Sequence, residues 1–252
     1  MNKIIGVLSG KGGVGKTTTV INLSAALMEF GKNVIAVDAD VKMSCLGLQL
    51  GMYYFPVTIN DVLMEKGKIH EALYIHSSGL RIIPASLSVT DAKLCKLKTM
   101  LEDPFFKDNI VLVDGPPGIE KNTLSILKNC SETLIVTTPE IPAITDAMKI
   151  LSACDETKTK PIGIIVNLYR DRDPNQVSID EIESSCGLPV IGIIPEDKII
   201  RKSIFRGTPS VLLSPYSPSS IAFKRIAASI IGEAYVAPRF TFIKRIFGRF
   251  GK

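Results

Sequence analysis

Seven short apolar runs recur along the chain, each rich in β-branched residues, and most are separated by stretches long enough for a helix. Strands that are apolar throughout are typical of a parallel sheet covered on both faces, because neither face meets water. The pattern therefore predicts an α/β fold in which a doubly wound, mostly parallel sheet carries helices on both faces. The runs are KIIGVLS, NVIAVD, LRIIPA, NIVLVD, TLIVTT, PIGIIVN and PVIGIIP.

The length of the chain and its apolar content predict a single large domain followed by a tail. With 252 residues, of which 46% are hydrophobic, the chain can bury a substantial core. No apolar run approaches the roughly 18 residues that cross a bilayer, and the start MNKIIGVLSG lacks the apolar region and cleavage site of a signal peptide. We expect a folded domain over residues 1–233, a linker over 234–238, a tail over 239–252, and a cytoplasmic protein.

The positive charge of the chain is concentrated in this tail. The formal net charge is +5, and five of the 30 cations lie in the last fourteen residues, which leaves 25 cations against 25 acids. The body is therefore neutral, and attraction to polyanions is expected from the tail. Five cysteines are spread along the chain without a Cys-x-x-Cys pair or a cluster with histidine, so buried free thiols are expected. They are Cys45, Cys95, Cys130, Cys154 and Cys186.

Residues 10–17, GKGGVGKT, match the pattern G-x-x-x-x-G-K-[ST] between the first apolar run and a helix-compatible stretch over 18–30. Glycines let backbone N–H groups turn inward around phosphates, Lys16 can reach the β and γ phosphates, and Thr17 can ligate Mg²⁺. A glycine-rich turn before a helix is the alternative, but a complete motif between a strand and a helix favours nucleotide binding. The loop residues expected to bind it are Gly12, Gly13, Val14, Gly15, Lys16, Thr17 and Thr18.

Three acids follow predicted strands, where ligands bind in open parallel sheets. Asp38 and Asp40 stand in VIAVDAD, and Asp114 stands in IVLVDGPPG. An acid at the end of a buried strand is well placed to hold a metal-bound water, so Asp114 is interpreted as a Walker B residue. Seen alone, such acids often only cap helices or form turns. Beside a P-loop they predict a Mg²⁺ site formed by Thr17, Asp38 and Asp114.

The stretch KGGVGKTT, with the additional Lys11 at the head of the loop, resembles the deviant Walker A motif of the MinD/ParA ATPases. The resemblance continues through VDAD, VDGPPG, TTPE, VNLY and IPED, covers nearly the whole body, and is nearest to MinD and its archaeal relatives. It implies an ATPase that uses ATP, ADP and Mg²⁺ and forms a homodimer when ATP is bound. The catalytic residues implied are Lys11, which reaches the partner's nucleotide, Lys16, and Asp40, which positions the attacking water in switch I. Asp114 begins switch II.

The same resemblance implies that Asn167 and the turn of Pro195, Glu196 and Asp197 hold adenine. An amide can read the donor and acceptor edge of that base, and both segments follow predicted strands. One departure from the family is Cys45, where relatives often have Asn or Asp in switch I. Cysteine is the weaker hydrogen-bonding group.

The tail has the pattern of an amphipathic helix that lies in an anionic membrane surface, and it resembles the membrane-targeting sequence that ends MinD proteins. A terminal core helix or a solvated end is the alternative. A single tail is expected to bind marginally, because the cost of ordering it nearly cancels the gain, whereas a dimer with two tails gains roughly 10²–10⁴ in avidity. The residues expected at the membrane are Phe240, Ile243, Lys244, Arg245, Ile246, Phe247, Arg249 and Phe250.

These patterns favour an ATP-dependent dimerising ATPase switch, peripheral on the inner face of the cell membrane, that positions or recruits cell-division or other spatially organised machinery. An activating or cargo protein is expected as a partner, without sequence-specific nucleic acid. The main alternative is a ParA-type DNA-partitioning ATPase that uses nonspecific DNA, against which the neutral body and the phenylalanines of the tail count. An iron–sulfur carrier lacks suitable cysteines, and a metabolic P-loop enzyme would need a second-substrate site.

Overall fold

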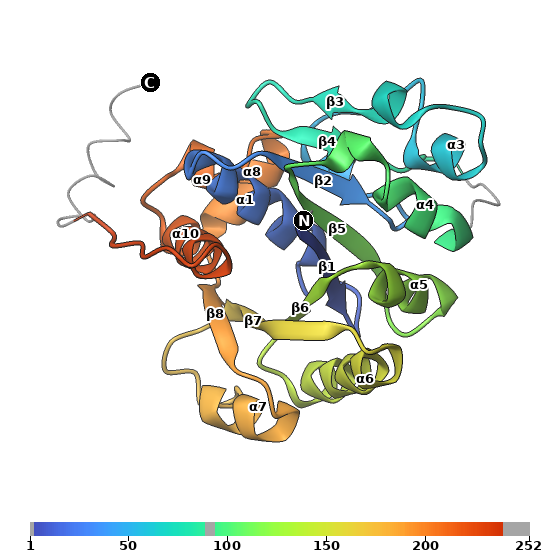
Figure 1. Ribbon diagram of the computed structural model, residues 1–252. Coiled ribbons are helices and arrows are strands. Elements are labelled where there is room, and N and C mark those ends of the chain that lie inside the picture. Colours follow the sequence, from blue (N-terminus) through green and yellow to red (C-terminus); the bar gives the residue numbers. More distant parts are fainter. Residues whose placement is uncertain (1–2, 89–93, 239–252) are drawn as a thin grey trace.

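The computed structural model describes residues 3–88 and 94–238. An eight-stranded sheet with the order β3-β4-β2-β5-β1-β6-β7-β8 lies between two layers of helices (Figure 1). Except for the antiparallel pair of β3 and β4, neighbouring strands are parallel, so the predicted fold is confirmed. The strands are β1 Lys3–Ser9, β2 Val34–Asp38, β3 Tyr74–Ile75, β4 Arg81–Ile83, β5 Ile110–Pro117, β6 Glu132–Thr137, β7 Lys160–Tyr169 and β8 Val190–Pro195.

Every predicted apolar run contains a strand, whereas β3 was not predicted. With two residues, β3 is too short to show an alternating pattern. It is held by a tight turn in which the His76 N–H donates to the Leu80 carbonyl and the Gly79 N–H donates to the His76 carbonyl.

The α-helices connect the strands as the spacing predicts. The first, α1, begins at Lys16, two residues before the expected start, and α10 is the last helix of the described chain. Short 3₁₀ helices cover Ile69–Ala72, Leu94–Lys96 and Pro104–Phe106. The α-helices are α1 Lys16–Glu29, α2 Leu46–Gln49, α3 Ile59–Leu63, α4 Leu97–Leu101, α5 Lys121–Asn129, α6 Ile141–Thr157, α7 Ile179–Cys186, α8 Lys198–Phe205, α9 Ser210–Leu213 and α10 Pro218–Ile230.

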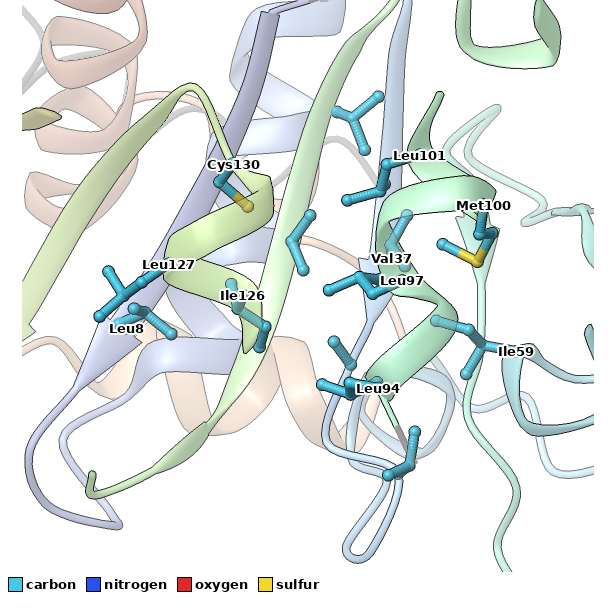
Figure 2. Packing of buried hydrophobic residues seen from close by; sticks show 14 of the residues in the cluster. Leu8, Val37, Ile59, Leu94, Leu97, Met100, Leu101, Ile126, Leu127 and Cys130 are labelled. Carbon is cyan, nitrogen blue, oxygen red and sulfur yellow. The ribbon is translucent and has the colours of Figure 1, made fainter. Parts of the chain in front are cut away.

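The sheet has a hydrophobic core on each face, which explains why its strands are apolar throughout. Along β2, Ile35 and Val37 point into the core shared with α3, α4, α5 and α6, part of which is shown in Figure 2. Val34 and Ala36 point into the opposite core, which contains α1, α2, α9 and α10. A third, smaller cluster lies around Ile182 of α7.

The predicted burial of the cysteines is only partly right. Cys130 and Cys154 are buried, and burial raises the pKa of the Cys130 thiol to about 12. Cys186 is half-buried and Cys45 is exposed, because Cys45 lies in the loop between β2 and α2. The side chain of Cys95 lies outside the described part of the chain.

The predicted tail over 239–252 also lies outside the described residues, so its helix and its membrane contact stay predictions. None of the helices over 3–88 and 94–238 combines the length and the apolar composition that crossing a bilayer requires.

The helical layer of α1 and α10 predicts a stability difference between two phenylalanines. Phe223 of α10 is fully buried, so Phe223→Ala should lower the free energy of unfolding by about 3–5 kcal/mol through lost burial and a cavity. Phe205 at the end of α8 is 91% exposed, so Phe205→Ala should change it by less than about 0.5 kcal/mol. Urea denaturation of both variants measures the difference, and equal losses would contradict the placement of α10.

Candidate nucleotide site

The predicted site residues converge at the carboxyl ends of the central strands. The loop over 10–15 connects β1 to α1, and β1 lies between β5 and β6. Asp38 ends β2 and pairs in register with Asp114 of β5. The P-loop and both acids are therefore brought to one edge of the sheet, where open α/β sheets bind ligands.

The backbone of the P-loop takes a shape that glycine permits. Gly13 and Gly15 have φ angles of 81° and 88°, in the left-handed region. A Cβ on Gly15 would also lie 2.1 Å from the side-chain nitrogen of Asn167, whereas no atom stands within 4 Å of a Cβ on Gly13. Gly15 caps α1 without a side-chain hydrogen bond, and the first turn has no acid. The N-terminus of α1 is thus suited to a phosphate.

Lys16 and Asp114 form the buried centre of the site. Lys16 Nζ lies 3.5 Å from Asp114 Oδ1, and the two side chains are 10% and 1% exposed. Neither Asp114 oxygen has a hydrogen-bond partner within the described chain. Burial raises the pKa of Asp114, and the charge of Lys16 acts in the opposite direction. A buried carboxylate beside a lysine, with oxygens that accept no hydrogen bond within the described chain, is suited to hold a metal-bound water.

Asp38 is buried beside Asp114 and fixes the start of α2. Its Oδ2 accepts bonds from the Ser44 hydroxyl at 2.8 Å, the Cys45 N–H at 3.2 Å and the Leu46 N–H at 3.1 Å. Burial, and next the charge of Asp114, raise the pKa of Asp38 to about 7. Cys45 contributes to this arrangement through its backbone, so the departure from the family pattern leaves the bond to Asp38 in place.

Asp40 lies on the segment that Asp38 anchors. Its side chain is half-buried, and its Oδ1 accepts a bond from the Met43 N–H at 3.1 Å. The segment is tied to the P-loop helix by a bond of 2.9 Å from the Thr18 hydroxyl to Gln49 Oε1. Sequence reasoning missed Gln49, since no motif marks it. The structure therefore places Asp40 next to the two buried acids, on a loop held at both ends.

Lys11 differs from Lys16 in its surroundings. Its side chain is 49% exposed, and Nζ lies 3.9 Å from Oε2 of Glu140, which is 61% exposed. Glu140 stands before α6 in the quoted stretch TTPE, although the sequence suggested no role for it. The loop position is fixed by a bond of 2.9 Å from the Ser9 hydroxyl to the Lys11 carbonyl. Only Lys16, of these two lysines, faces the buried acids.

Asn167 reaches the P-loop directly. It is buried at the end of β7, and its Nδ2 donates to the Val14 carbonyl at 2.8 Å. Leu168, next in the chain, has a φ of 57°. Asn167 thus contacts the backbone of the P-loop in this structure, and its expected contact with adenine stays a prediction.

The turn after β8 is engaged in bonds of its own. Glu196 accepts from Arg170 Nε at 2.6 Å, a partner that sequence reasoning missed although it lies three residues after Asn167. Asp197 caps α8 by accepting from the Ile199 N–H, and it accepts from the Ser219 hydroxyl at 2.9 Å. Pro195 lines a cavity of about 370 Å³ between β8 and α10. Glu196 and Asp197 therefore position this turn.

The donor set fits a magnesium–nucleotide site better than a metal centre made by protein alone. Over 3–88 and 94–238, no three His, Cys, Asp or Glu side chains form a group that could hold a metal ion. Mg²⁺ at a P-loop takes one or two protein ligands and completes its shell with water and phosphate oxygens. An iron–sulfur cluster needs several thiolates together, and the described cysteines form no such group.

Because Asp114 is buried, its ionisation makes the stability of the fold depend on pH. Since its folded pKa is raised, the ionised form is disfavoured in the fold, and stability is lost as pH rises through that pKa. Relative to the intact chain, Asp114→Asn should therefore become more stable as pH rises above the ordinary aspartate pKa of 3.8, in the absence of nucleotide and magnesium. Unfolding temperatures of both proteins across pH measure this trend, because loss of the ion pair with Lys16 lowers stability separately. Asp171→Asn, at an exposed position, is the matched control. A variant that becomes less stable relative to the intact chain as pH rises would contradict this account.

Comparisons with known proteins agree with this geometry. Residues 1–231 match a family model described as ParA: NUBPL iron-transfer P-loop NTPase. An uncharacterized ATP-binding protein of Methanocaldococcus jannaschii is 40% identical over 97% of this chain and 97% of its own. The septum site-determining protein MinD of Synechocystis is 36% identical over 92% of this chain and 91% of its own.

A solved structure extends the agreement to the fold. The septum site-determining protein MinD from Pyrococcus horikoshii, complexed with Mg-ADP, superposes with a TM-score of 0.86 at 33% identity, covering 91% of this chain and 96% of that one. The P-loop that the sequence predicts and the sheet edge on which it lies therefore have a common origin with these relatives: the chain belongs to the ParA family of P-loop NTPases, with MinD among its relatives.

Proposed function

We propose that the protein is an ATP-dependent dimerising ATPase switch that binds the cytoplasmic membrane through residues 239–252 and positions or recruits other proteins, as in MinD-like systems. The observation that carries this proposal is the pair of lysines in one P-loop, with Lys16 buried against Asp114 and Lys11 on the surface. An ordinary P-loop needs only the buried lysine. The exposed lysine is available to a second subunit.

In this proposal the chain binds ATP and ADP with Mg²⁺, as supported by the family and by the MinD relative complexed with Mg-ADP. Bound ATP with Mg²⁺ supplies the phosphoanhydride bond to be broken. The N–H groups of the P-loop and the N-terminus of α1 hold the phosphates, and Lys16 neutralises their charge. Thr17, Asp38 and Asp114 would hold Mg²⁺ or its water.

Hydrolysis requires a positioned water and a stabilised leaving group. Asp40 orients the water from switch I, the segment held by Asp38 and Gln49. Lys11 reaches the partner's phosphates in the ATP-bound homodimer and leaves its long contact with Glu140. Asn167 and the turn over 195–197 hold the base, with Arg170 supporting Glu196.

The membrane part of the proposal depends on the amphipathic pattern of the tail and on the neutral body. Apolar residues insert at the level of the headgroups while the cations meet anionic lipid. A dimer presents two tails, so the nucleotide state sets membrane occupancy. Relatives more than 30% identical are named as MinD, which favours this function over DNA partitioning.

Substitution of Lys16 and substitution of Lys11 should have different effects. Lys16→Ala removes the charge beside the β and γ phosphates, so ATP binding should weaken at least tenfold and turnover should be lost. Lys11→Ala should leave monomer affinity within about twofold but abolish ATP-dependent dimerisation and turnover. Calorimetry and light scattering with ATP and Mg²⁺ measure the two effects. Loss of binding in the Lys11→Ala monomer would show that Lys11 acts within its own subunit.

The tail can be tested without disturbing the nucleotide site. Deletion of 239–252, or Phe247→Asp with Phe250→Asp, should keep ATP binding and dimerisation but eliminate ATP-dependent sedimentation with phosphatidylglycerol vesicles. Sedimentation of the intact chain should weaken with salt, because the Debye length falls from about 10 Å at 0.1 M toward 3 Å at 1 M. An unfolded deletion variant would indicate that the tail is part of the core.

A further inference from the structure

A surface on α8 combines cations with exposed aromatic and aliphatic side chains. Lys198, Arg201, Lys202 and Phe205 follow the i, i+3, i+4, i+7 spacing of one helical face, and all four are exposed. Ser203, on the other side of α8, is buried. The outward side of α8 is therefore basic and ends in a phenylalanine.

Residues from two other parts of the chain extend this surface. Phe205 and Arg206 line an open cavity of about 480 Å³ together with Tyr53 and Ile75. Tyr53 is 69% exposed and Ile75 is 67% exposed. We call these residues the α8 face, comprising Lys198, Arg201, Lys202, Phe205, Arg206, Tyr53 and Ile75.

The segments of the α8 face are held together by close packing. A Cβ on Gly207 would lie 2.8 Å from the Leu50 carbonyl oxygen, so the end of α8 presses against the end of α2. His76, next to Ile75, is buried, and its Nδ1 lies 2.8 Å from the Ser78 hydroxyl oxygen. The exposure of Tyr53, Ile75 and Phe205 is therefore a property of a packed surface.

The cations of the α8 face have no acidic counterparts. None of them forms an ion pair with another described residue. The residues lining the cavity include no acid. Lys198 and Lys202, and likewise Lys202 and Arg206, are spaced i, i+4, where like charges destabilise a helix. An anionic surface would relieve that repulsion.

The α8 face lies in the same helical layer as α10, the last helix of the described chain. Figure 1 shows α1, α8, α9 and α10 on the same side of the sheet. After α10 the chain returns to the end of α1, where the rings of Phe30 and Tyr235 are 6.1 Å apart, edge to face. The described chain ends three residues later, at residue 238.

We propose that the α8 face is a second membrane contact, which lies on an anionic lipid bilayer and sets the orientation of the body once the tail has inserted. The proposal rests on the proposed function, because the tail supplies the first contact. Aromatic side chains favour the headgroup level, and Lys and Arg pair with anionic lipid. Nucleic acid would use the cations but leave Phe205 and Ile75 in water.

The chain has no tryptophan, so a single introduced tryptophan reports on one position. Phe205→Trp in the full chain, with ATP, Mg²⁺ and phosphatidylglycerol vesicles, should show blue-shifted emission, quenching by brominated phosphatidylglycerol and protection from iodide. Lys128→Trp, exposed on α5 in the opposite layer, should show none of these changes. Phosphatidylcholine vesicles should leave both spectra unchanged.

The cations can be tested separately. Lys202→Gln with Arg206→Gln should lower the vesicle association constant about 25-fold, since each cation near an anionic surface contributes roughly fivefold. Lys107→Gln with Lys128→Gln removes two exposed cations from the opposite layer and should change it less than twofold. Nucleotide binding should be unchanged in both double variants, and neither variant should unfold at a lower temperature than the intact chain, because relief of the i, i+4 repulsion can only stabilise α8.

Three results separate the possible failures. If the Phe205→Trp protein sediments with vesicles but its tryptophan stays open to iodide and untouched by brominated lipid, the second contact is wrong and the tail anchor stands. If the intact chain does not sediment with vesicles in the presence of ATP, the proposed membrane function is wrong, and the second contact is wrong with it. If Lys202→Gln with Arg206→Gln weakens binding to duplex DNA and leaves vesicle binding intact, the α8 face binds nucleic acid and the membrane proposal is overturned.

Discussion

The structure depends on two carboxylates that are buried side by side. Asp38, the last residue of β2, pairs in register with Asp114 within β5, and both are almost inaccessible to solvent. Burial, and next the repulsion between the two like charges, raise the pKa of Asp38. Lys16 is the cation beside them. Two features of the site stabilise this pair. The glycine loop positions Lys16 beside it, and the backbone N–H groups at the start of α2 donate to Asp38.

The elements around that pair could be predicted from the sequence because each has a local signal. The apolar runs, the P-loop and the acids at the strand ends each lie within a few residues, and the physics of a covered parallel sheet brings them to one edge. The contacts that set the finer geometry join distant residues. Asn167 meets the P-loop across 153 positions, and the bond from Ser219 to Asp197 spans 22. No local pattern encodes such pairings.

The exposure of Cys45 and of the α8 face could not be predicted from local sequence patterns either. Cys45 is exposed because of where β2 ends and α2 begins, which apolar content does not reveal. The periodicity of α8 was visible in the sequence, yet amphipathic spacing alone is usually the mark of core packing. Only the structure shows that the cations and Phe205 point outward, next to Tyr53 and Ile75.

Contiguous contacts connect the buried acids to that distant surface. Asp38 holds the start of α2, Gln49 binds Thr18, and Leu50 packs against Gly207. A shift of switch I would therefore displace contacts at both α1 and the end of α8, since closely packed elements cannot move independently.

The ring contact between Phe30 and Tyr235 holds the segment after α10 against the end of α1. Position 239 is four residues along the chain from Tyr235, and an extended chain spans at most about 3.6 Å per residue. Residue 239 therefore lies no farther than about 14 Å from the Cα of Tyr235. If residues 239–252 insert into a bilayer as proposed, this side of the body would lie close to the lipid, and its rotation would be restricted. Lateral diffusion along the bilayer would then be diffusion of an oriented particle.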